Sequence, residues 1–389
     1  MEPMAQTCSP LEMLERLVSF DTTSRNSNLE LIGFVQAYLA SHGITAETLP
    51  DETGAKANLI ATIGPAAPGG IVLSAHSDVV PVDGQPWDTE PFKVVSRDGR
   101  LYGRGTADMK TFPAVALALV PQFLAARMKR PVHIVLSYDE EVGCLGAPPL
   151  VKALVAKGLR PEAAIIGEPT MMRVVNAHKA IHSWVTEITG HEAHSSNVHK
   201  GVSAVMAAGE MLGELSRIAA DLRAKGDPSG RFDPPFSTVQ SSIIQGGTAI
   251  NILARRCVFG WETRTLPGGD PSHVIGRMER FAFDDLLPRM RAIASTCNIT
   301  FTARSRVPAL MPEPGSPAEA LALSLAGLNA ADAVSYATEA GIFQEAGIPA
   351  IVCGPGDIAQ AHQPNEFIDE SQLAACERFM HRLMARLAG

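Results

Sequence analysis

The chain has 389 residues, too many for one ordinary domain, so we expect two domains or one domain with a large insertion. Its 33 Lys and Arg against 41 Asp and Glu give a formal net charge of -8, and the lack of a basic block argues against a nucleic-acid partner. No apolar run is long enough to cross a bilayer and the N-terminal residues lack the order of a secretory signal, so we predict a soluble, cytoplasmic protein without a membrane partner. The six cysteines are scattered without a C-x-x-C pair, which argues against a disulfide framework and against a cysteine zinc site.

The first predicted elements are two helices. The segment SPLEMLERLVSFDT has apolar residues at helical spacing behind Ser9 and Pro10, an N-cap and first-turn pair, and ELIGFVQAYLASHG repeats this pattern and ends at Gly43. Short apolar runs then alternate with helical stretches, and these runs are GGIVLSAHSD, RPVHIVLSYDEE, AAIIGEP and PAIVCGPG. Continuous apolar runs that alternate with helices indicate a parallel sheet buried on both faces.

Residues 179–305 have a different pattern. Their strand-like segments show partial alternation of polar and apolar residues, as expected for a sheet with one solvated face. With two helical segments between them they give the order β-α-β-β-α-β, which is typical of a ferredoxin-like unit. We therefore predict an α/β fold with a mixed, mainly parallel sheet flanked by helices, formed by residues 1–178 and 306–389, and an inserted α+β ferredoxin-like domain at residues 179–305.

Acidic and histidine residues follow the apolar runs, where parallel strands should end. In open α/β sheets, ligands bind beyond the carboxyl ends of the strands. Taken singly, each of these residues would more often be a solvated loop acid, a turn-capping aspartate or a surface histidine. Their shared placement at one predicted edge favours a functional site, and the residues are His76, Asp78, Asp108, Glu140, Glu141, Glu168 and His362.

This set of residue types is typical of a metal site. Two imidazoles and several carboxylates suit two divalent ions of the zinc or cobalt type better than a thiol-rich structural site would. The adjacent carboxylates of Glu140 and Glu141 are costly to hold together unless a positive charge compensates them. Because a pair of ions about 3.5–4 Å apart is a common means of hydrolysing an acyl or phosphoryl bond, the pattern predicts a two-metal hydrolase.

The motifs resemble those of the M20 metallopeptidase family, which includes acetylornithine deacetylases, succinyl-diaminopimelate desuccinylases and glutamate carboxypeptidases. The resemblance covers nearly the whole chain in the family's order, through SAHSDVVP, LYGRGTADMK, DEEVG, GEPT, GHEAHSS, GGTAIN, ETRTLPG and GPGDIAQAHQPNEFI. It implies a zinc-peptidase-like catalytic domain that holds two divalent ions, and an inserted lid domain that pairs two subunits in a homodimer.

The resemblance also implies a role for each metal ligand. It places His76 and Glu168 on one ion, Glu141 and His362 on the other, and Asp108 on both. The family has a cis peptide bond after the bridging aspartate, which here would join Asp108 to Met109.

Three further residues gain roles from the resemblance. Asp78 would orient His76, Glu140 would be the general base, and His194 would donate to the oxyanion from the lid of the second subunit. Without the resemblance, His194 would be read as a solvated loop histidine.

The resemblance implies an N-acetylated amino acid as the substrate. Arg264 would hold its carboxylate and Asn251 would add a polar contact, although both could instead make internal strand-end hydrogen bonds. The stretch SYATEAGIFQ is similar to that of acetylornithine deacetylases, and Glu339 within it would select an ammonium group. The expected reaction is hydrolysis of N2-acetyl-L-ornithine to ornithine and acetate, in arginine biosynthesis.

Three alternatives remain open. Within the family, the chain could be an N-acyl amino acid deacylase of broader specificity or a dipeptide-cleaving carboxypeptidase. In another class, it could be a non-catalytic metal- or amino-acid-binding protein on the same fold, which the presence of Glu140 beside Glu141 argues against. A thiol hydrolase that uses Cys144 or Cys353 lacks a motif that places a histidine and an orienting acid beside either cysteine.

Overall fold

The computed structural model describes residues 7–389, which form two compact units. Unit 1 consists of the described part of Met1–Ala177 together with Leu310–Ala333 and Thr338–Gly389, and unit 2 consists of His178–Ala309 and Val334–Ala337. The short stretch 334–337 therefore groups with unit 2, although the chain on both sides of it belongs to unit 1. Among residues 7–389 we find no helix with the length and apolarity that a membrane span requires.

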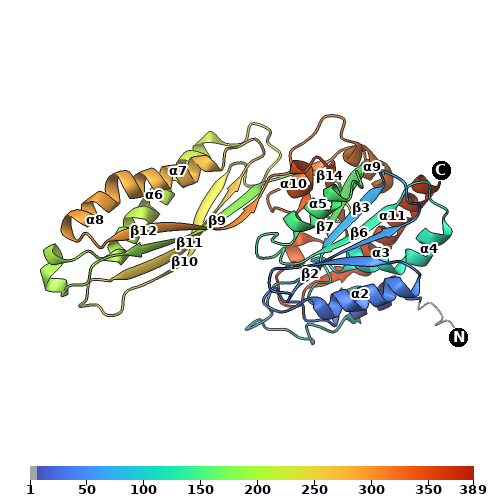
Figure 1. The fold of residues 1–389 in the computed structure, drawn as a ribbon, viewed down its shortest axis with the longest axis horizontal. Coiled ribbons are helices and arrows are strands. Elements are labelled where there is room, and N and C mark those ends of the chain that lie inside the picture. The colour runs from blue at the N-terminus through green and yellow to red at the C-terminus, as the bar shows by residue number, and fades with distance from the viewer. Residues whose placement is uncertain (1–6) are drawn as a thin grey trace. The chain divides into compact units, whose positions relative to one another are not determined.

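The main sheet of unit 1 is mixed, with a parallel centre (Figure 1). Its strands are β1 (Ala46–Pro50), β2 (Ala57–Ile63), β3 (Ile71–His76), β6 (Val132–Ser137), β7 (Ala163–Pro169), β8 (Val175–His178), β13 (Asp332–Val334) and β14 (Ala350–Gly354). They lie in the order β1-β2-β6-β3-β7-β14-β8-β13, and β6, β3, β7 and β14 run parallel to one another. Every residue of these four strands is buried, which explains their continuous apolar sequences.

Helices cover both faces of this sheet (Figure 1). The helices of unit 1 are α1 (Pro10–Val18), α2 (Leu29–Ser41), α3 (Thr111–Ala118), α4 (Val120–Ala125), α5 (Ala147–Ala156), α9 (Pro317–Ala326), α10 (Ala340–Glu345), the 3-10 helix η3 (Ile358–Gln360) and α11 (Glu370–Ala388). Helices α1, α2, α3, α4, α9 and α11 share one hydrophobic core with the sheet, and α5 and α10 pack together against the other face. A small antiparallel sheet completes unit 1 with β4 (Val95–Arg97), β5 (Arg100–Tyr102) and β15 (Phe367–Asp369).

The predicted start of the first helix is confirmed. The Ser9 side chain accepts a hydrogen bond from the backbone N–H of Glu12, and the Glu12 carboxylate accepts one from the backbone N–H of Ser9. This reciprocal pair satisfies two backbone donors at the N-terminus of α1 and fixes where the helix begins.

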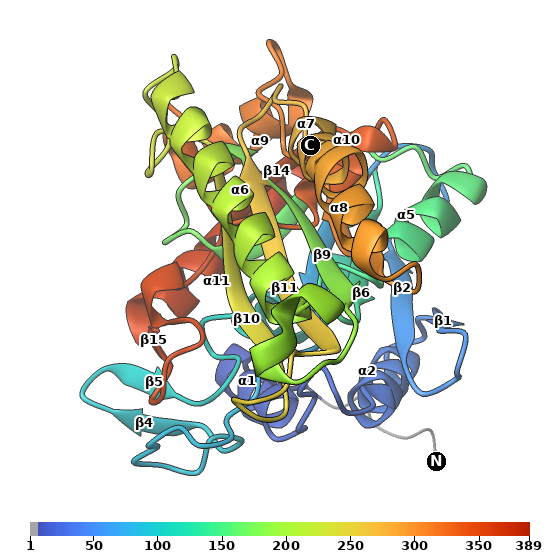
Figure 2. The same ribbon diagram turned by 90° about the vertical axis from the view of Figure 1, so that its left-hand side faces the viewer.

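Unit 2 is an antiparallel sheet with helices on one face (Figure 2). Its elements are β9 (Ala180–Thr189), the 3-10 helix η1 (Ser195–Lys200), α6 (Ala204–Lys225), β10 (Thr238–Gly246), β11 (Arg256–Thr265), α7 (Ser272–Arg280), the π-helix η2 (Phe281–Leu286), α8 (Leu287–Ile293) and β12 (Asn298–Val307). The predicted β-α-β-β-α-β order is confirmed, and the spatial order β10-β11-β9-β12 is that of a ferredoxin-like sheet. Burial alternates along β11 because only one face is covered, and this face has a core separate from that of unit 1.

Candidate metal centre

The carboxyl edge of the main sheet carries the residues singled out in the sequence. His76 is the last residue of β3, and Glu168 lies at the end of β7. Glu140 and Glu141 follow β6, which pairs with β3 in parallel. Parallel pairing of β6, β3 and β7 brings these strand ends together, so residues far apart in sequence meet at one edge.

Two loops add the remaining side chains. Asp108 lies in the loop between β5 and α3, and its peptide bond to Met109 is cis. His362 lies in the loop between η3 and β15, with a positive φ of 64°.

Two groups of potential ligand atoms share Asp108. His76, Asp108 and Glu168 form one group, in which His76 Nε2 lies 3.0 Å from Asp108 Oδ1 and 3.8 Å from Glu168 Oε1. Asp108, Glu141 and His362 form the other, in which His362 Nε2 lies 3.3 Å from Asp108 Oδ2 and 3.1 Å from Glu141 Oε2. Asp108 therefore presents one oxygen to each imidazole, which is the arrangement required of a bridging carboxylate.

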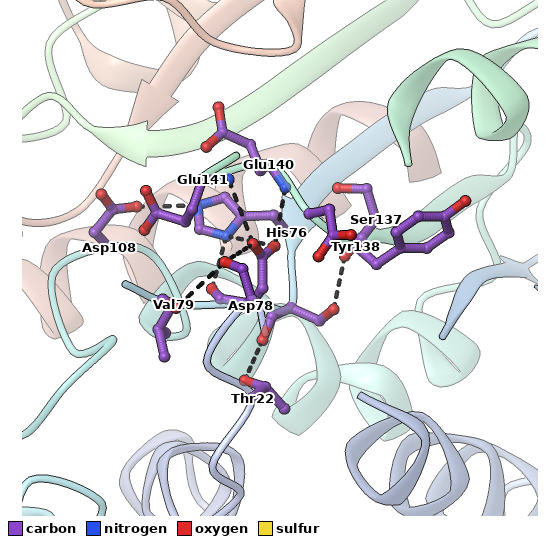
Figure 3. A network of polar contacts seen from close by, with 12 residues as sticks. Thr22, His76, Asp78, Val79, Asp108, Ser137, Tyr138, Glu140 and Glu141 are labelled. Atoms are coloured by element: carbon purple, nitrogen blue, oxygen red, sulfur yellow. Dashed lines mark hydrogen bonds and ion pairs between the residues drawn. The ribbon is translucent and has the colours of Figure 1, made fainter. Parts of the chain in front are cut away.

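The imidazole of His76 is fixed from behind (Figure 3). Its Nδ1 lies 2.9 Å from the backbone carbonyl oxygen of Asp78, a contact that places the ring proton on Nδ1 and leaves the lone pair on Nε2 facing Asp108 and Glu168. Burial favours the neutral ring, but hydrogen bonding to Asp108 and the charge of Glu168 raise the pKa of His76 well above its usual value. The ring therefore faces a position where a positive charge is strongly favoured.

Asp78 connects His76 to the two glutamates after β6 (Figure 3). Its Oδ1 lies 3.6 Å from His76 Nδ1 and accepts the backbone N–H of Glu140 at 3.1 Å. Its Oδ2 accepts the backbone N–H of Glu141 at 3.3 Å and the Ser24 hydroxyl at 2.7 Å. The Asp78 carboxylate thus holds the end of β3 against the segment that follows β6.

Buried carboxylates crowd this edge. Burial, together with the charges of Glu141 and Asp108, raises the pKa of Glu140 to about 8. Burial and the charge of Asp108 likewise raise the pKa of Glu141 to about 7, and that of Glu168 well above its usual value. So many carboxylates can ionise together at neutral pH only if cations lie among them.

The donor atoms fit divalent cations of the zinc type. All the ligand atoms of the two groups are imidazole nitrogens or carboxylate oxygens, which these ions bind. Within residues 7–389, the buried Glu141 Oε1 has no hydrogen-bond partner, a state that is costly for a carboxylate unless a cation meets it. His362 is half exposed, so the group that contains it is open to solvent on one side.

Glu339, the predicted selector of an ammonium group, is buried beneath this edge. Its Oε2 accepts a hydrogen bond from the Ser74 hydroxyl at 3.2 Å, and its Oε1 accepts one from Ser137. Ser74 belongs to β3 and Ser137 to β6, so Glu339 joins the two strands that lead to His76 and to Glu140.

The other predicted site residues lie in unit 2. His194 is exposed and precedes η1, and its Nδ1 lies 2.8 Å from the Ser196 hydroxyl. Asn251 lies in the neighbouring loop, where its carbonyl accepts the backbone N–H of Ser195. Arg264, near the end of β11, donates to Glu262 at 3.1 Å, so its guanidinium already has a carboxylate partner.

Several residues that were not singled out in the sequence contact the candidate site residues. Arg104 and Glu366 form a buried ion pair beside Asp108, with a separation of 2.6 Å. The Cys144 thiol donates to Glu140 Oε1 at 3.3 Å. Arg104 and Glu366 stand inside the motifs LYGRGTADMK and QPNEFI, so their position next to predicted ligands was the available signal.

Comparisons with known proteins identify the family of this chain. Residues 72–386 match the model of peptidase family M20/M25/M40. An acetylornithine deacetylase from Myxococcus xanthus is 37% identical over 384 residues, which cover 97% of this chain and 97% of that protein.

Solved structures share the fold at low identity. An M20 family metallo-carboxypeptidase from Sulfolobus solfataricus has a TM-score of 0.78 at 16% identity, covering 98% of this chain and 99% of that one. A dinuclear metal-binding peptidase of the M20 family from Bacillus subtilis has a TM-score of 0.64 at 17% identity, covering 97% of each chain. The match over most of the sequence makes this chain a member of peptidase family M20/M25/M40, and hence a metal-dependent hydrolase.

Proposed function

We propose that this enzyme hydrolyses N2-acetyl-L-ornithine to ornithine and acetate. The observation that carries the proposal is its similarity, over 97% of both chains, to a protein named acetylornithine deacetylase. The two ligand groups that share Asp108 support it, because they provide for the pair of ions that such hydrolysis requires. With this substrate, the reaction would belong to arginine biosynthesis, and we propose that it takes place in the cytoplasm.

The proposed cofactor is a pair of zinc ions, with cobalt as the alternative. His76 and Glu168 would hold one ion, Glu141 and His362 the other, and Asp108 both. When bound, the ions supply Lewis acidity, which polarises the acyl carbonyl and lowers the pKa of water. Asp78 would keep His76 in the tautomer that offers Nε2 as a ligand.

Glu140 is the proposed general base. Its carboxylate would accept a proton from the attacking water and return that proton to the amine that leaves. The water oxygen ends on the acetate, the amide C–N bond breaks, and the amine carries the returned proton. Burial beside other carboxylates raises the pKa of Glu140, which suits a group that must both accept and release a proton.

The remaining substrate contacts would come from unit 2 and from Glu339 of unit 1. His194 would donate to the oxyanion, Arg264 would exchange Glu262 for the substrate carboxylate, and Asn251 would add a polar contact. Glu339 would attract the ornithine ammonium group, which requires at least one of its oxygens to give up a serine partner.

We further propose that unit 2 is a lid that pairs two subunits in a homodimer. Supporting this are exposed apolar side chains on the edge strand β10 and near it, namely Ile243, Ile244 and Ile250, and Met206 on α6. Mixing inactive His194→Ala and Glu140→Gln chains tests the pairing, because a site that takes His194 from the second subunit would regain part of its activity. A mixture that stays inactive while the chains exchange subunits would contradict it.

Turnover on a substrate panel tests the proposed reaction. The chain is stripped of metal with a chelator, restored with zinc or cobalt, and assayed on N2-acetyl-L-ornithine, N-succinyl-diaminopimelate, N-acetylmethionine and dipeptides. We expect N2-acetyl-L-ornithine to have the highest kcat/KM, and only after metal is restored. Equal turnover of all N-acetyl amino acids would favour the broader deacylase, preferred cleavage of dipeptides would favour a carboxypeptidase, and no turnover at all would favour a binding protein.

A further inference from the structure

Behind the candidate ligands, a chain of hydrogen-bonded side chains, two of them buried and one half-buried, ties the loop of Asp108 to the loop of His362. Its members are Gln85, Arg104 and Glu366, which we call the clamp. The side chains of Arg104 and Glu366 are each only 1% exposed, and their ion pair is 2.6 Å long. Both loops belong to unit 1, and each carries one ligand candidate of the solvent-facing group.

Glu366 holds the Asp108 side of the clamp. Its Oε1 accepts three backbone N–H groups, from Gly105 at 3.0 Å, Ala107 at 2.9 Å and Asp108 itself at 3.1 Å. Its Oε2 accepts the Arg104 guanidinium. One carboxylate therefore determines the course of the loop up to the residue that would bridge both ions.

Gln85 holds the His362 side of the clamp. Its Nε2 donates to the backbone carbonyl of His362 at 3.0 Å, and its Oε1 accepts from Arg104 at 2.6 Å. His362 has a φ of 64°, a backbone conformation that non-glycine residues adopt only when the surroundings hold them there. The hydrogen bond to Gln85 is one of the contacts that do so.

Hydrogen bonds thus run without a break from the His362 carbonyl through Gln85, Arg104 and Glu366 to the Asp108 amide. The clamp holds the backbone of these two residues, and their side chains meet on the opposite side, where His362 Nε2 and Asp108 Oδ2 lie 3.3 Å apart. A buried ion pair is weak evidence for stability, because desolvation offsets most of its attraction. Its geometry, by contrast, fixes where two loops stand relative to each other.

We propose that Glu366 is a positioning residue that, through the clamp, sets the separation of Asp108 and His362 for the metal ion of the solvent-facing group. This inference rests on the proposed function in assuming that two ions bind. Supporting residues behind metal ligands commonly change metal affinity by about 10- to 100-fold when they are replaced. Loss of Glu366 should therefore weaken the binding step of the solvent-facing group more than the step of His76 and Glu168, because only the former depends on both loops that the clamp joins.

Cobalt titration of the metal-free full chain tests the proposal. Calorimetry would measure the affinity and number of Co2+ ions, and visible absorption would report the coordination geometry at each step. The variants are Glu366→Gln and the milder Gln85→Ala, which removes the His362 contact from a half-buried side chain. The matched control is Glu214→Gln, because Glu214 is also a poorly exposed carboxylate paired with arginines, Arg217 and Arg277, but lies in unit 2.

We expect two Co2+ ions to bind the unchanged chain and Glu214→Gln with similar affinities. In Glu366→Gln, one step should weaken by about 10- to 100-fold with an altered absorption band, and Gln85→Ala should weaken the same step by less. If Glu366→Gln fails to fold, Gln85→Ala decides the matter alone. Wild-type affinities and spectra in every variant that folds would overturn the positioning role only, whereas an unchanged chain that does not bind two ions would overturn the proposed function and this inference with it.

Discussion

The carboxylate of Asp78 accepts the backbone N–H of Glu140, with Oδ1 3.1 Å from the nitrogen. The same oxygen lies 3.6 Å from Nδ1 of His76. One side chain therefore positions both a ligand candidate at the end of β3 and the proposed base after β6. In the proposed mechanism, this contact would couple the metal ligand to the group that transfers the proton.

Replacing Asp78 by Asn should impair both functions. An amide keeps one oxygen acceptor but turns a donor toward one of the two backbone N–H groups. We expect metal affinity or kcat to fall about 10- to 100-fold, measured by calorimetry and steady-state kinetics. Ser24→Ala, which removes only the hydroxyl bonded to Asp78, is the control and should have a much smaller effect. Equal effects of the two substitutions would contradict the orienting role.

Replacing Glu140 by Gln should abolish most of the turnover without loss of metal. General acid–base groups contribute about 10²- to 10⁴-fold, and we expect kcat to fall within that range while both ions stay bound. Elemental analysis and kinetics on the same preparation would check this. The matched variant is Cys144→Ser, which keeps a donor to Glu140 and should stay within a few fold of the unchanged chain. A Glu140→Gln enzyme of near-normal kcat would exclude it as the base.

The stability of the metal-free protein should fall as the pH rises. The folded-state pKa values of Glu140 and Glu141 are raised to about 8 and about 7 by burial and neighbouring carboxylates, from 4.5 in an unperturbed chain. In the folded protein these two carboxyl groups resist ionisation. The free energy of unfolding therefore falls as the pH rises from about 4.5 toward about 7 for Glu141 and about 8 for Glu140. Hydrogen bonds to Asp108 and Glu141 raise the pKa of His362 from 6.5 to about 10. The protonated ring therefore stabilises the folded protein fully below pH 6.5, and this contribution is lost as the pH rises toward 10.

Metal should counter this loss, because cations take the place of the protons. We expect zinc to raise Tm more at about pH 8 than at about pH 6. Thermal unfolding with chelator and with added zinc at each pH would measure the difference. A rise in Tm that is equal at both pH values, or larger at the lower one, would be inconsistent with carboxylates crowded around a cation site.

Replacing Glu339 by Gln tests its role in substrate selection. A hydrogen bond to a charged group contributes about 1.5–3 kcal/mol, so kcat/KM for N2-acetyl-L-ornithine should fall about 10- to 100-fold with little change for N-acetylmethionine. Ser137→Ala serves as the control for the contact between β6 and Glu339. If the preference between the two substrates stays the same, Glu339 does not select the ammonium group and acts only between the strands.

Replacing His194 by Ala should slow the chemical step alone. Removal of an oxyanion donor costs about 10²- to 10³-fold in kcat, and we expect this loss with metal content unchanged. His199, an exposed histidine in the η1 helix that follows His194, provides the control, since His199→Ala should leave kcat near normal. Similar losses in both variants would point to damage to the loop instead.

The sequence alone determined much of the catalytic unit. Mainly apolar runs such as IVLSAH and VHIVLS predicted buried parallel strands. A strand that is covered on both faces is apolar at successive positions, whereas a strand with one solvated face alternates between polar and apolar residues. Residues at the ends of parallel strands were expected to share one edge of the sheet, and in the structure His76 and Glu168 lie at the ends of β3 and β7 while Glu141 follows β6. The short strands β4, β5, β13 and β15 were not predicted, since three residues are too few to show a period.

Only the tertiary structure decided which atoms meet. A sequence can place Glu339 near a motif but cannot indicate that both of its oxygens face serines of β3 and β6. Nor does it reveal that residues 334–337 group with unit 2, because such grouping depends on contacts with distant segments.

The clamp shows the same division. Gln85, Arg104 and Glu366 are separated by many residues, and each alone is an ordinary polar side chain. Strand pairing and loop closure bring them behind Asp108 and His362, where Arg104 and Glu366 are buried and must satisfy each other, and where half-buried Gln85 joins them. Local pattern thus determined the elements and the residue types at the sheet edge, and packing between distant segments determined the distances on which the chemistry depends.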